Sequence, residues 1–166
     1  MTGDEPLLPA DRFIVGTDGE PGHRVFYLQI VRDDDVTSVR LEKQQVALLA
    51  EHVQRFLSSR PTLVEPDEPD GLRFVPADAW IVGDIGLGPD PDTGLLAIVL
   101  EELAFPDDDA DPDAAPTGRS VTFTLTPRQQ ATFVVAANAA VAGGRPPCPL
   151  CGNPLSAEGH FCPRLN

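Results

Sequence analysis

The chain has 166 residues, a length that suits one domain, or one domain with a small appendage. Twenty-six acidic residues against twelve basic ones give a formal net charge of −14. Nucleic-acid affinity comes largely from Lys and Arg contacts to phosphates, so this charge argues strongly against a nucleic-acid-binding function. A nucleic-acid-binding zinc protein is the least favoured hypothesis, because only Arg145 and Arg164 flank the cysteine-rich tail. It equally disfavours docking on an anionic membrane surface.

No membrane segment or secretory signal is expected. The apolar stretches stay short of the roughly 20 residues of a membrane span, and Met1–Arg12 is acidic and contains proline, unlike a signal peptide. The three cysteines cannot all pair within the chain. Without a secretory signal, the pattern favours a cytoplasmic protein whose cysteines are free thiols or metal ligands.

The first half of the chain predicts three strands followed by a helix. The strands are expected at Arg12–Val15, Arg24–Val31 and Val36–Leu41. The turn residues Asp18–Gly22 separate the first two strands. Apolar residues between Val46 and Leu57 recur at helical spacing, and Pro61 ends this helix because proline disfavours helical geometry in the residue before it.

The second half predicts the same order of elements. Its strands are expected at Ala79–Gly83, Leu95–Glu101 and Ser120–Leu125. The helix begins at Thr126, with Gln129 completing a capping box, and ends at Gly143. The extra residues of this half are assigned to the hairpin Asp84–Gly94 and the loop Phe105–Gly118.

Two short matches favour an internal duplication. FIVG at 13–16 is matched by WIVG at 80–83, and KQQ at 43–45 is matched by RQQ at 128–130. We therefore predict an α+β body at 1–144, made of two pseudo-repeated strand-strand-strand-helix units at about 12–60 and 79–143, with antiparallel sheet and a pseudo-twofold relation. Whether the six strands join into one sheet stays open. Residues 145–166 are predicted to form a zinc-knuckle tail.

Acidic segments separate or decorate these units. Glu65–Asp70 is the expected linker between the halves, and Pro106–Asp113 is expected to form a solvated loop, since neither can bury much apolar surface. Asp33, Asp34 and Asp35 are most simply the tip of a hairpin.

The tail contains the strongest chemical signal of the chain. Cys148 and Cys151 have the spacing of a zinc knuckle, and His160 and Cys162 follow shortly after. Three thiolates and an imidazole make a complete tetrahedral zinc set, and four protein ligands leave no open position for water. We therefore predict a structural zinc and no catalytic one.

Two alternatives remain for these residues. His160 and Cys162 are close together for ligands of one metal, so Glu158 or His23 could supply the fourth ligand instead. The spacing of Cys148 and Cys151 also fits a redox CxxC motif, but such motifs open a helix, and the segment GNP at 152–154 opposes one.

No nucleophile–base set is indicated by spacing, so the first functional hypothesis is a non-catalytic binding or adaptor protein. The alternative is an enzyme that acts on a small anionic or phosphorylated substrate in a cleft between the repeats, where Arg24, Arg40 and the hairpin Asp84–Asp92 could meet. Arg12, Arg24 and Arg40 could line an anion pocket, although paired surface arginines are the commoner outcome.

Three segments resemble an actinobacterial family known as domain-of-unknown-function family 3090: FIVGTDGEPGHRVFYLQ, VRLEKQQVALLAEHV and CPLCGNPLSAEGHFCPRLN. The resemblance runs nearly end to end, and the tail is its most specific part. It implies a cytoplasmic protein of unassigned activity, without catalytic residues to carry over. Family members tend to be encoded beside a histidine-phosphatase-like protein and a kinase-like protein, which implies one of these as a protein partner.

Overall fold

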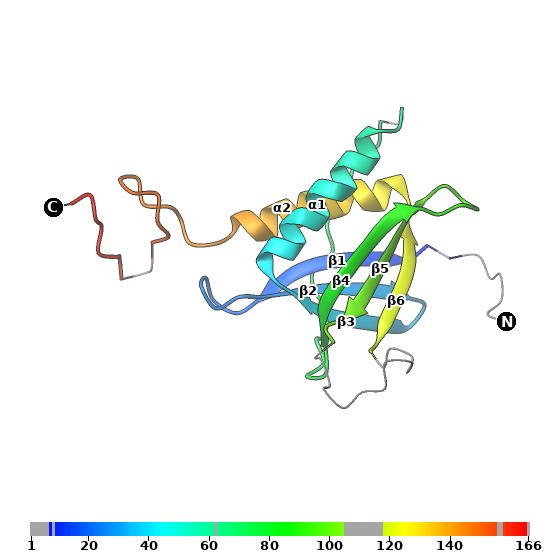
Figure 1. Cartoon of the computed structure of the whole chain (residues 1–166), viewed down its shortest axis with the longest axis horizontal. Helices are drawn as coiled ribbons and strands as arrows, with labels where there is room; N and C mark the ends of the chain where they lie inside the picture. The colour runs from blue at the N-terminus through cyan, green and yellow to red at the C-terminus, as the bar shows by residue number, and fades with distance from the viewer. Residues whose placement is uncertain (1–6, 8, 62, 105–117, 156–157, 166) are drawn as a thin grey trace.

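The computed structural model describes residues 7, 9–61, 63–104, 118–155 and 158–165. Each half of the chain contains three strands and then a helix (Figure 1). The elements are β1 (Arg12–Asp18), β2 (Val25–Arg32), β3 (Asp35–Leu41), α1 (Lys43–Ser58), β4 (Trp80–Pro89), β5 (Leu96–Glu102), β6 (Ser120–Leu125) and α2 (Pro127–Ala142). The α+β class is as predicted.

The six strands form one mixed sheet in which the strand order follows the chain order. Neighbouring strands are antiparallel within each half. The two halves join through β3 and β4, which run parallel and pair at Val39 with Trp80 and at Arg40 with Ile81. The antiparallel sheet predicted for each unit is present, but the six-stranded sheet as a whole is mixed. The parallel pair exists because α1 and the linker carry the chain back to the starting end of the sheet.

The two outer edges of the sheet meet at one point. Pro9 forms an isolated parallel bridge with Thr124 of β6, and the Ala10 amide donates to the Thr124 carbonyl at 3.1 Å. The segment just before β1 thus lies beside the last strand. Sequence patterns predicted neither this contact nor the joining of all six strands, because strand pairing depends on tertiary packing.

Both helices lie on the same side of the sheet and pack against each other (Figure 1). The apolar core between these layers includes three phenylalanines. The ring of Phe13 in β1 lies 5.1 Å from that of Phe123 in β6 and 4.8 Å from that of Phe133 in α2, measured between ring centroids. Phe13 therefore connects the first strand to the last strand and the last helix.

Each helix is also tied to the opposite half of the body by a glutamine in its first turn. The Oε1 atom of Gln45 accepts from the Glu42 amide at 2.8 Å, while its Nε2 atom donates to the Val82 carbonyl in β4 at 3.1 Å. In α2 the predicted capping box of Thr126 and Gln129 is confirmed.

Gln129 repeats the arrangement in the other direction. Its Oε1 atom accepts from the Thr126 amide at 2.9 Å, and its Nε2 atom donates to the Ala10 carbonyl at 2.5 Å. Gln45 and Gln129 each lie three residues after the cap residue of their helix and make reciprocal contacts between the halves. The KQQ and RQQ match is one residue out of register with this equivalence, since it aligns Gln45 with Gln130.

The linker between the halves is anchored to the body. Arg12 and Arg128 pair with Asp70 and Asp67 at 2.7 and 3.1 Å. The fully buried Gln29 of β2 exchanges hydrogen bonds with the backbone of residues 73–74. The acidic part of the linker at 65–70 is exposed, as expected, but residues 73–74, which follow it, are fixed to the sheet.

One expectation about the loops is corrected by the structure. The strand predicted at Ala79–Gly83 continues to Pro89, because Ile85 and Leu87 alternate with small residues and pair with β5, and the connecting turn is confined to the residues around Asp90. Asp33–Asp35 lies at the tip of the β2–β3 hairpin, as predicted. The expected acidic loop Pro106–Asp113 lies outside the described residues.

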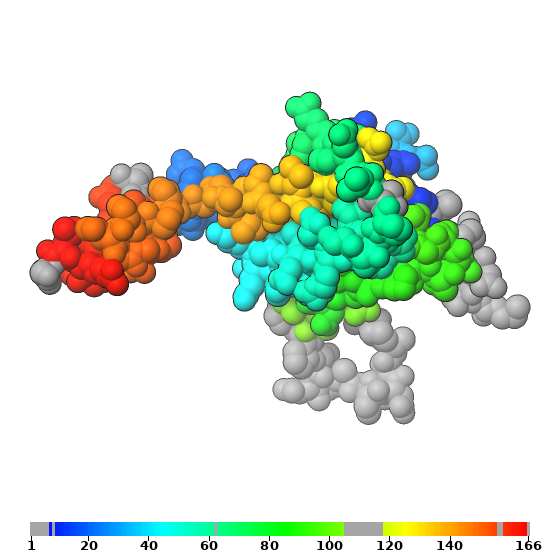
Figure 2. All heavy atoms as spheres, turned by 90° about the horizontal axis from the view of Figure 1, so that it is seen from above, coloured from blue at the N-terminus to red at the C-terminus, as the bar shows by residue number. Residues whose placement is uncertain are grey.

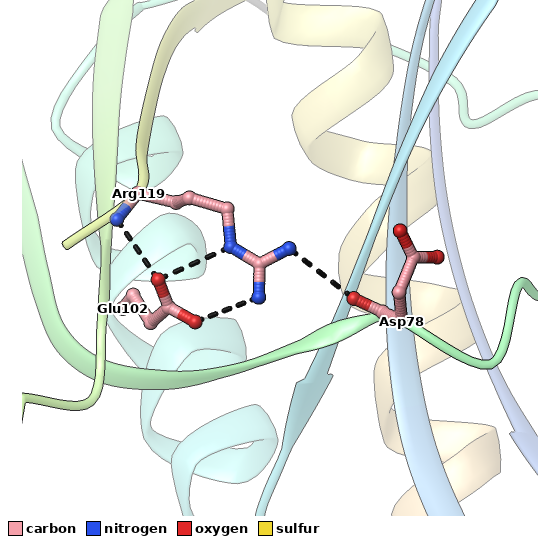
Figure 3. A network of polar contacts seen from close by, with 3 residues as sticks. All are labelled: Asp78, Glu102 and Arg119. Carbon is pink, nitrogen blue, oxygen red and sulfur yellow. Dashed lines mark hydrogen bonds and ion pairs between the residues drawn. The ribbon is translucent and has the colours of Figure 1, made fainter.

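A polar network joins β5 to the start of β6 (Figure 3). Arg119 donates from its backbone and its guanidinium to the Glu102 carboxylate, with a shortest distance of 2.7 Å, and to the Asp78 carbonyl at 3.3 Å. The side-chain hydrogen bond from Arg119, together with its backbone N–H, lowers the Glu102 pKa from its ordinary value of 4.5 to about 2.

Among the described residues, neither helix has the length and apolar character required to cross a bilayer.

Replacing Gly83 with alanine is expected to destabilise the body by about 1–3 kcal/mol, because a Cβ atom there would lie 2.8 Å from the Leu103 Cα atom and the backbone would have to shift. Gly88, in the same strand, has no heavy atom within 4 Å of an added Cβ. Gly88→Ala is the matched control, and chemical denaturation measures both. Equal unfolding free energies for the two variants would contradict the proposed crowding.

The Glu102–Arg119 pair makes stability depend on pH in a defined window. Glu102 has its ordinary pKa of 4.5 in the unfolded chain and a pKa of about 2 in the folded chain. The pair therefore stabilises the folded state fully above pH 4.5, and this stabilisation is lost as the pH falls towards 2. The difference in Tm between the parent and Glu102→Gln is therefore expected to be largest above pH 4.5 and to close towards pH 2. Glu101→Gln on the same strand should show no such trend.

Candidate metal centre

The segment after α2 projects from the end of that helix, away from the sheet (Figures 1 and 2). Its described residues, 145–155 and 158–165, contain no helix or extended strand. Only Cys148 and Cys162 are buried there. Because burial in this segment is concentrated on cysteine, its order depends on the contacts that the cysteines make.

A tight hairpin presents the first two cysteines. The Cys148 amide donates to the Asn153 carbonyl at 2.8 Å, and the Gly152 amide donates to the Cys148 carbonyl at 2.8 Å. Gly152 has a φ of 75°, a left-handed conformation that glycine adopts without steric cost. The turn brings the Cys148 and Cys151 side chains to the same side.

The second pair of side chains returns to this hairpin. Gly159 has a φ of 86° immediately before His160, and this bend allows two closely spaced residues to face one point. The His160 Nε2 atom lies 3.1 Å from the Cys151 sulfur, and the Cys162 sulfur lies 4.0 Å from the Cys148 sulfur.

The four donor atoms of Cys148, Cys151, His160 and Cys162 all lie within 4.8 Å of one another. Ordinary zinc–sulfur and zinc–nitrogen bonds in a tetrahedron place two sulfurs about 3.8 Å apart and a sulfur and a nitrogen about 3.5 Å apart. The separations of 4.0 and 3.1 Å are close to these values. The donor set and its spacing therefore fit one tetrahedral metal ion.

The electrostatics of the four-residue cluster favour a thiolate at Cys148. Backbone N–H groups of Cys151 and Leu150 lower the pKa of Cys148. The Asn153 amide lowers the pKa of Cys151, but burial and the neighbouring cysteines outweigh it and raise that pKa. Three thiols crowded together resist sharing several negative charges, and a bound cation would remove that repulsion.

The alternative fourth ligands lie elsewhere. Glu158 and His23 line a hollow beside the tail and do not belong to the four-residue cluster. The His160 Nδ1 atom is buried and has no hydrogen-bond partner among the described residues, so Nε2 is the nitrogen directed at the cysteines. The redox alternative requires a helix after Cys151, and the described residues 152–155 and 158–165 form none.

Residues 7–162 match the family described as "Protein of unknown function (DUF3090)". The chain belongs to this family. The match covers all four residues of the Cys/His cluster. No curated protein and no solved structure is similar enough to this chain to count as a match.

The structure separates the three arginines that the sequence suggested for an anion pocket. Arg12 pairs with Asp70, so it does not line an anion pocket with the other arginines. Arg24 and Arg40 do line one hollow, but no residue of the hairpin Asp84–Asp92 lines it with them.

Lys43 and Arg145 adjoin this region and were not predicted. Two facts could have pointed to them: Lys43 is the only lysine of the chain, and Arg145 closely precedes the first cysteine of the cluster.

Metal binding can be tested by replacing a histidine of the cluster, His160, and a histidine outside it, His52. Purified protein is expected to hold close to one divalent metal ion per chain, and His160→Ala should lose most of it because one of four donors is removed. His52→Ala is the control, since His52 lies exposed on α1 with its Nδ1 atom 2.7 Å from the Leu48 carbonyl oxygen. Elemental analysis measures both. Full metal content in His160→Ala would exclude this histidine as a ligand.

Proposed function

We propose that this protein is a non-catalytic binding or adaptor protein with a structural zinc ion held by Cys148, Cys151, His160 and Cys162. The observation that supports it is the convergence of four metal-binding side chains within 4.8 Å in a segment without other secondary structure. Metal binding in comparable peptides contributes on the order of 10–16 kcal/mol, enough to order such a segment.

Zinc is the metal that this donor set favours. Three soft thiolates and one imidazole suit zinc, whereas magnesium, calcium and manganese prefer oxygen ligands. Four protein ligands complete a tetrahedron and leave no position for a reacting water, which favours a structural role. When bound, the ion would supply positive charge to the thiolates and fix the tail, without taking part in a reaction.

The tail carries apolar side chains that the zinc would hold in place. Leu150, Phe161 and Leu165 are 48, 84 and 72% exposed. Phe161 lies between two of the proposed ligands in the sequence, yet its side chain is exposed to solvent. Exposed aromatic and aliphatic groups on a rigid support are typical of protein-binding surfaces. We therefore propose this surface as the contact for a protein partner, with the phosphatase-like or kinase-like protein as the candidate.

The domain arrangement belongs to the same proposal. The body at 1–144 would act as the scaffold, the tail at 145–166 as the partner-binding element, and both would work in the cytoplasm, where thiols stay reduced. The reciprocal contacts of Gln45 and Gln129 support an origin of the body by internal duplication.

The alternative function is an enzyme acting on a small anionic or phosphorylated substrate between the halves. The hollow beside the β3–β4 contact, lined by Arg24, Arg40 and Ile81, supports binding of an anion there. The spacing of the sequence indicates no nucleophile–base set beside it, so the binding role is preferred.

Partner binding is tested by affinity purification from the native host under conditions that preserve zinc. The parent chain is expected to retain zinc and to capture the phosphatase-like or kinase-like protein, and Phe161→Ser should reduce that capture by about tenfold or more if the ring is a binding hot spot. Phe74→Ser is the matched control, because Phe74 is 87% exposed and lies in the linker.

The metal content of each variant must be measured in the same preparations. Loss of capture in Phe161→Ser with zinc retained supports the proposed surface. Undiminished capture by Phe161→Ser, or the absence of both candidate proteins from the parent preparation, would contradict it.

A further inference from the structure

A second feature of the molecule lies where the body meets the tail. A hollow of about 340 Å³ is bordered by the β1–β2 connection, the start of α1, the end of α2 and the metal-binding segment. Three of its lining side chains are basic: Arg24, Lys43 and Arg145. Within the described part of the chain, no acidic side chain lines it. We name this feature the basic hollow.

The backbone around the basic hollow is shaped to admit these three cations. Arg24 donates from Nη1 to the Gly143 carbonyl at the end of α2. The Lys43 Nζ atom lies 3.2 Å from the place of a Cβ atom at Gly144. The Arg145 guanidinium occupies the space that a side chain at Gly22 would need, and the φ of 96° at Gly22 also favours glycine.

The positive charge of the basic hollow is not neutralised by carboxylates. Among the described residues, Arg12, Arg55, Arg119 and Arg128 form ion pairs, whereas Arg24, Lys43 and Arg145 form none. This is unexpected in a chain with a net charge of −14. Glu20, Glu42 and Glu158 line adjacent hollows, and none of them lies within ion-pair distance of these cations.

The negative C-terminal end of α2 neutralises only part of this positive charge. A helix C-terminus carries roughly half a negative charge, against three full positive charges. The Nε atom of Arg24 is also buried without a hydrogen-bond partner among the described residues. A buried charged donor is costly to leave unsatisfied, so the arrangement has capacity for a further acceptor.

From these observations we propose that the basic hollow binds a small molecule that carries a phosphate group on an apolar part. Three cations, partly offset by the carbonyl end of α2, are sufficient to neutralise the double negative charge of a phosphate monoester. Guanidinium groups also bind phosphate oxygens in pairs. Phe26, Val141 and Pro154 line the same space and would contact the apolar part. The volume falls in the range of small-ligand pockets.

This proposal does not depend on the role of the metal, although the hollow adjoins the metal-binding segment. Arg145 lies in the connector, and Pro154 lies in the hairpin that presents the first two cysteines. A ligand in the basic hollow would therefore contact both the body and the tail, and binding would restrict the motion of one against the other.

Phenyl phosphate is a suitable probe, because it joins one phosphate to one ring. Titration of the metal-loaded full chain is followed by calorimetry and by amide chemical shifts. Binding is expected to shift amides around Gly22 and Gly144. Lys43→Gln and Arg145→Gln should each weaken the affinity by about tenfold, the cost of one charge-assisted hydrogen bond.

Arg55→Gln is the matched control, since Arg55 lies exposed on α1 and pairs only with Glu51. Its affinity should change by less than about twofold, as for an ordinary surface substitution. Metal content and amide spectra check that each variant stays folded and loaded. This separates loss of the basic hollow from loss of the metal centre.

The ligand class is resolved by two further probes. Inorganic phosphate is expected to bind more weakly than phenyl phosphate, because it lacks the apolar contact, and benzyl alcohol is expected not to bind. The proposal is overturned if phenyl phosphate shifts no amide around the hollow or if Arg55→Gln weakens binding as much as Arg145→Gln. Equal affinities for phenyl phosphate and inorganic phosphate would overturn the apolar part of the assignment.

Discussion

Two glutamine side chains define how the halves of this protein hold each other. Gln45 and Gln129 each use one end of the amide to cap their own helix and the other end to bind a backbone carbonyl of the opposite half. A side chain with both a donor and an acceptor is needed at that place, since Glu or Leu would leave a backbone group without its partner. The exchange holds the first turn of each helix beside the segment with which the opposite half begins.

Local patterns in the sequence predict the helices and most of the strands, but they do not predict how the strands pair across the two halves. The apolar spacing around Val46 and the Thr126–Gln129 capping box predicted both helices, because such signals depend on neighbours within a few residues. The pairing of β3 with β4 and the bridge from Pro9 to Thr124 are long-range contacts without a local signature. The length of β4 was underestimated because its glycines and proline are typical of turns, although Ile85 and Leu87 follow strand alternation.

The metal centre was easier to predict than the basic hollow for a chemical reason. Cysteine and histidine are rare in this chain, so a cluster with ligand spacing stands out even without a structure. What the sequence concealed was the bend at Gly159 that lets His160 and Cys162 converge. Arginine and lysine occur on every surface, so only the fold separates Arg12, which has a carboxylate partner, from Arg24, which has none.

The parallel contact between β3 and β4 has a consequence for how such a body can arise. It uses only two residue pairs, and the opposite end of the sheet closes through one bridge of the same parallel kind. A single strand-strand-strand-helix unit would leave both of these edges and one glutamine amide without partners. Two separate copies could satisfy each other through the same contacts. On the proposed duplication, the contacts fit descent from a symmetric homodimer of a chain half this size. The linker would then have turned an association that depended on concentration into one within a single molecule.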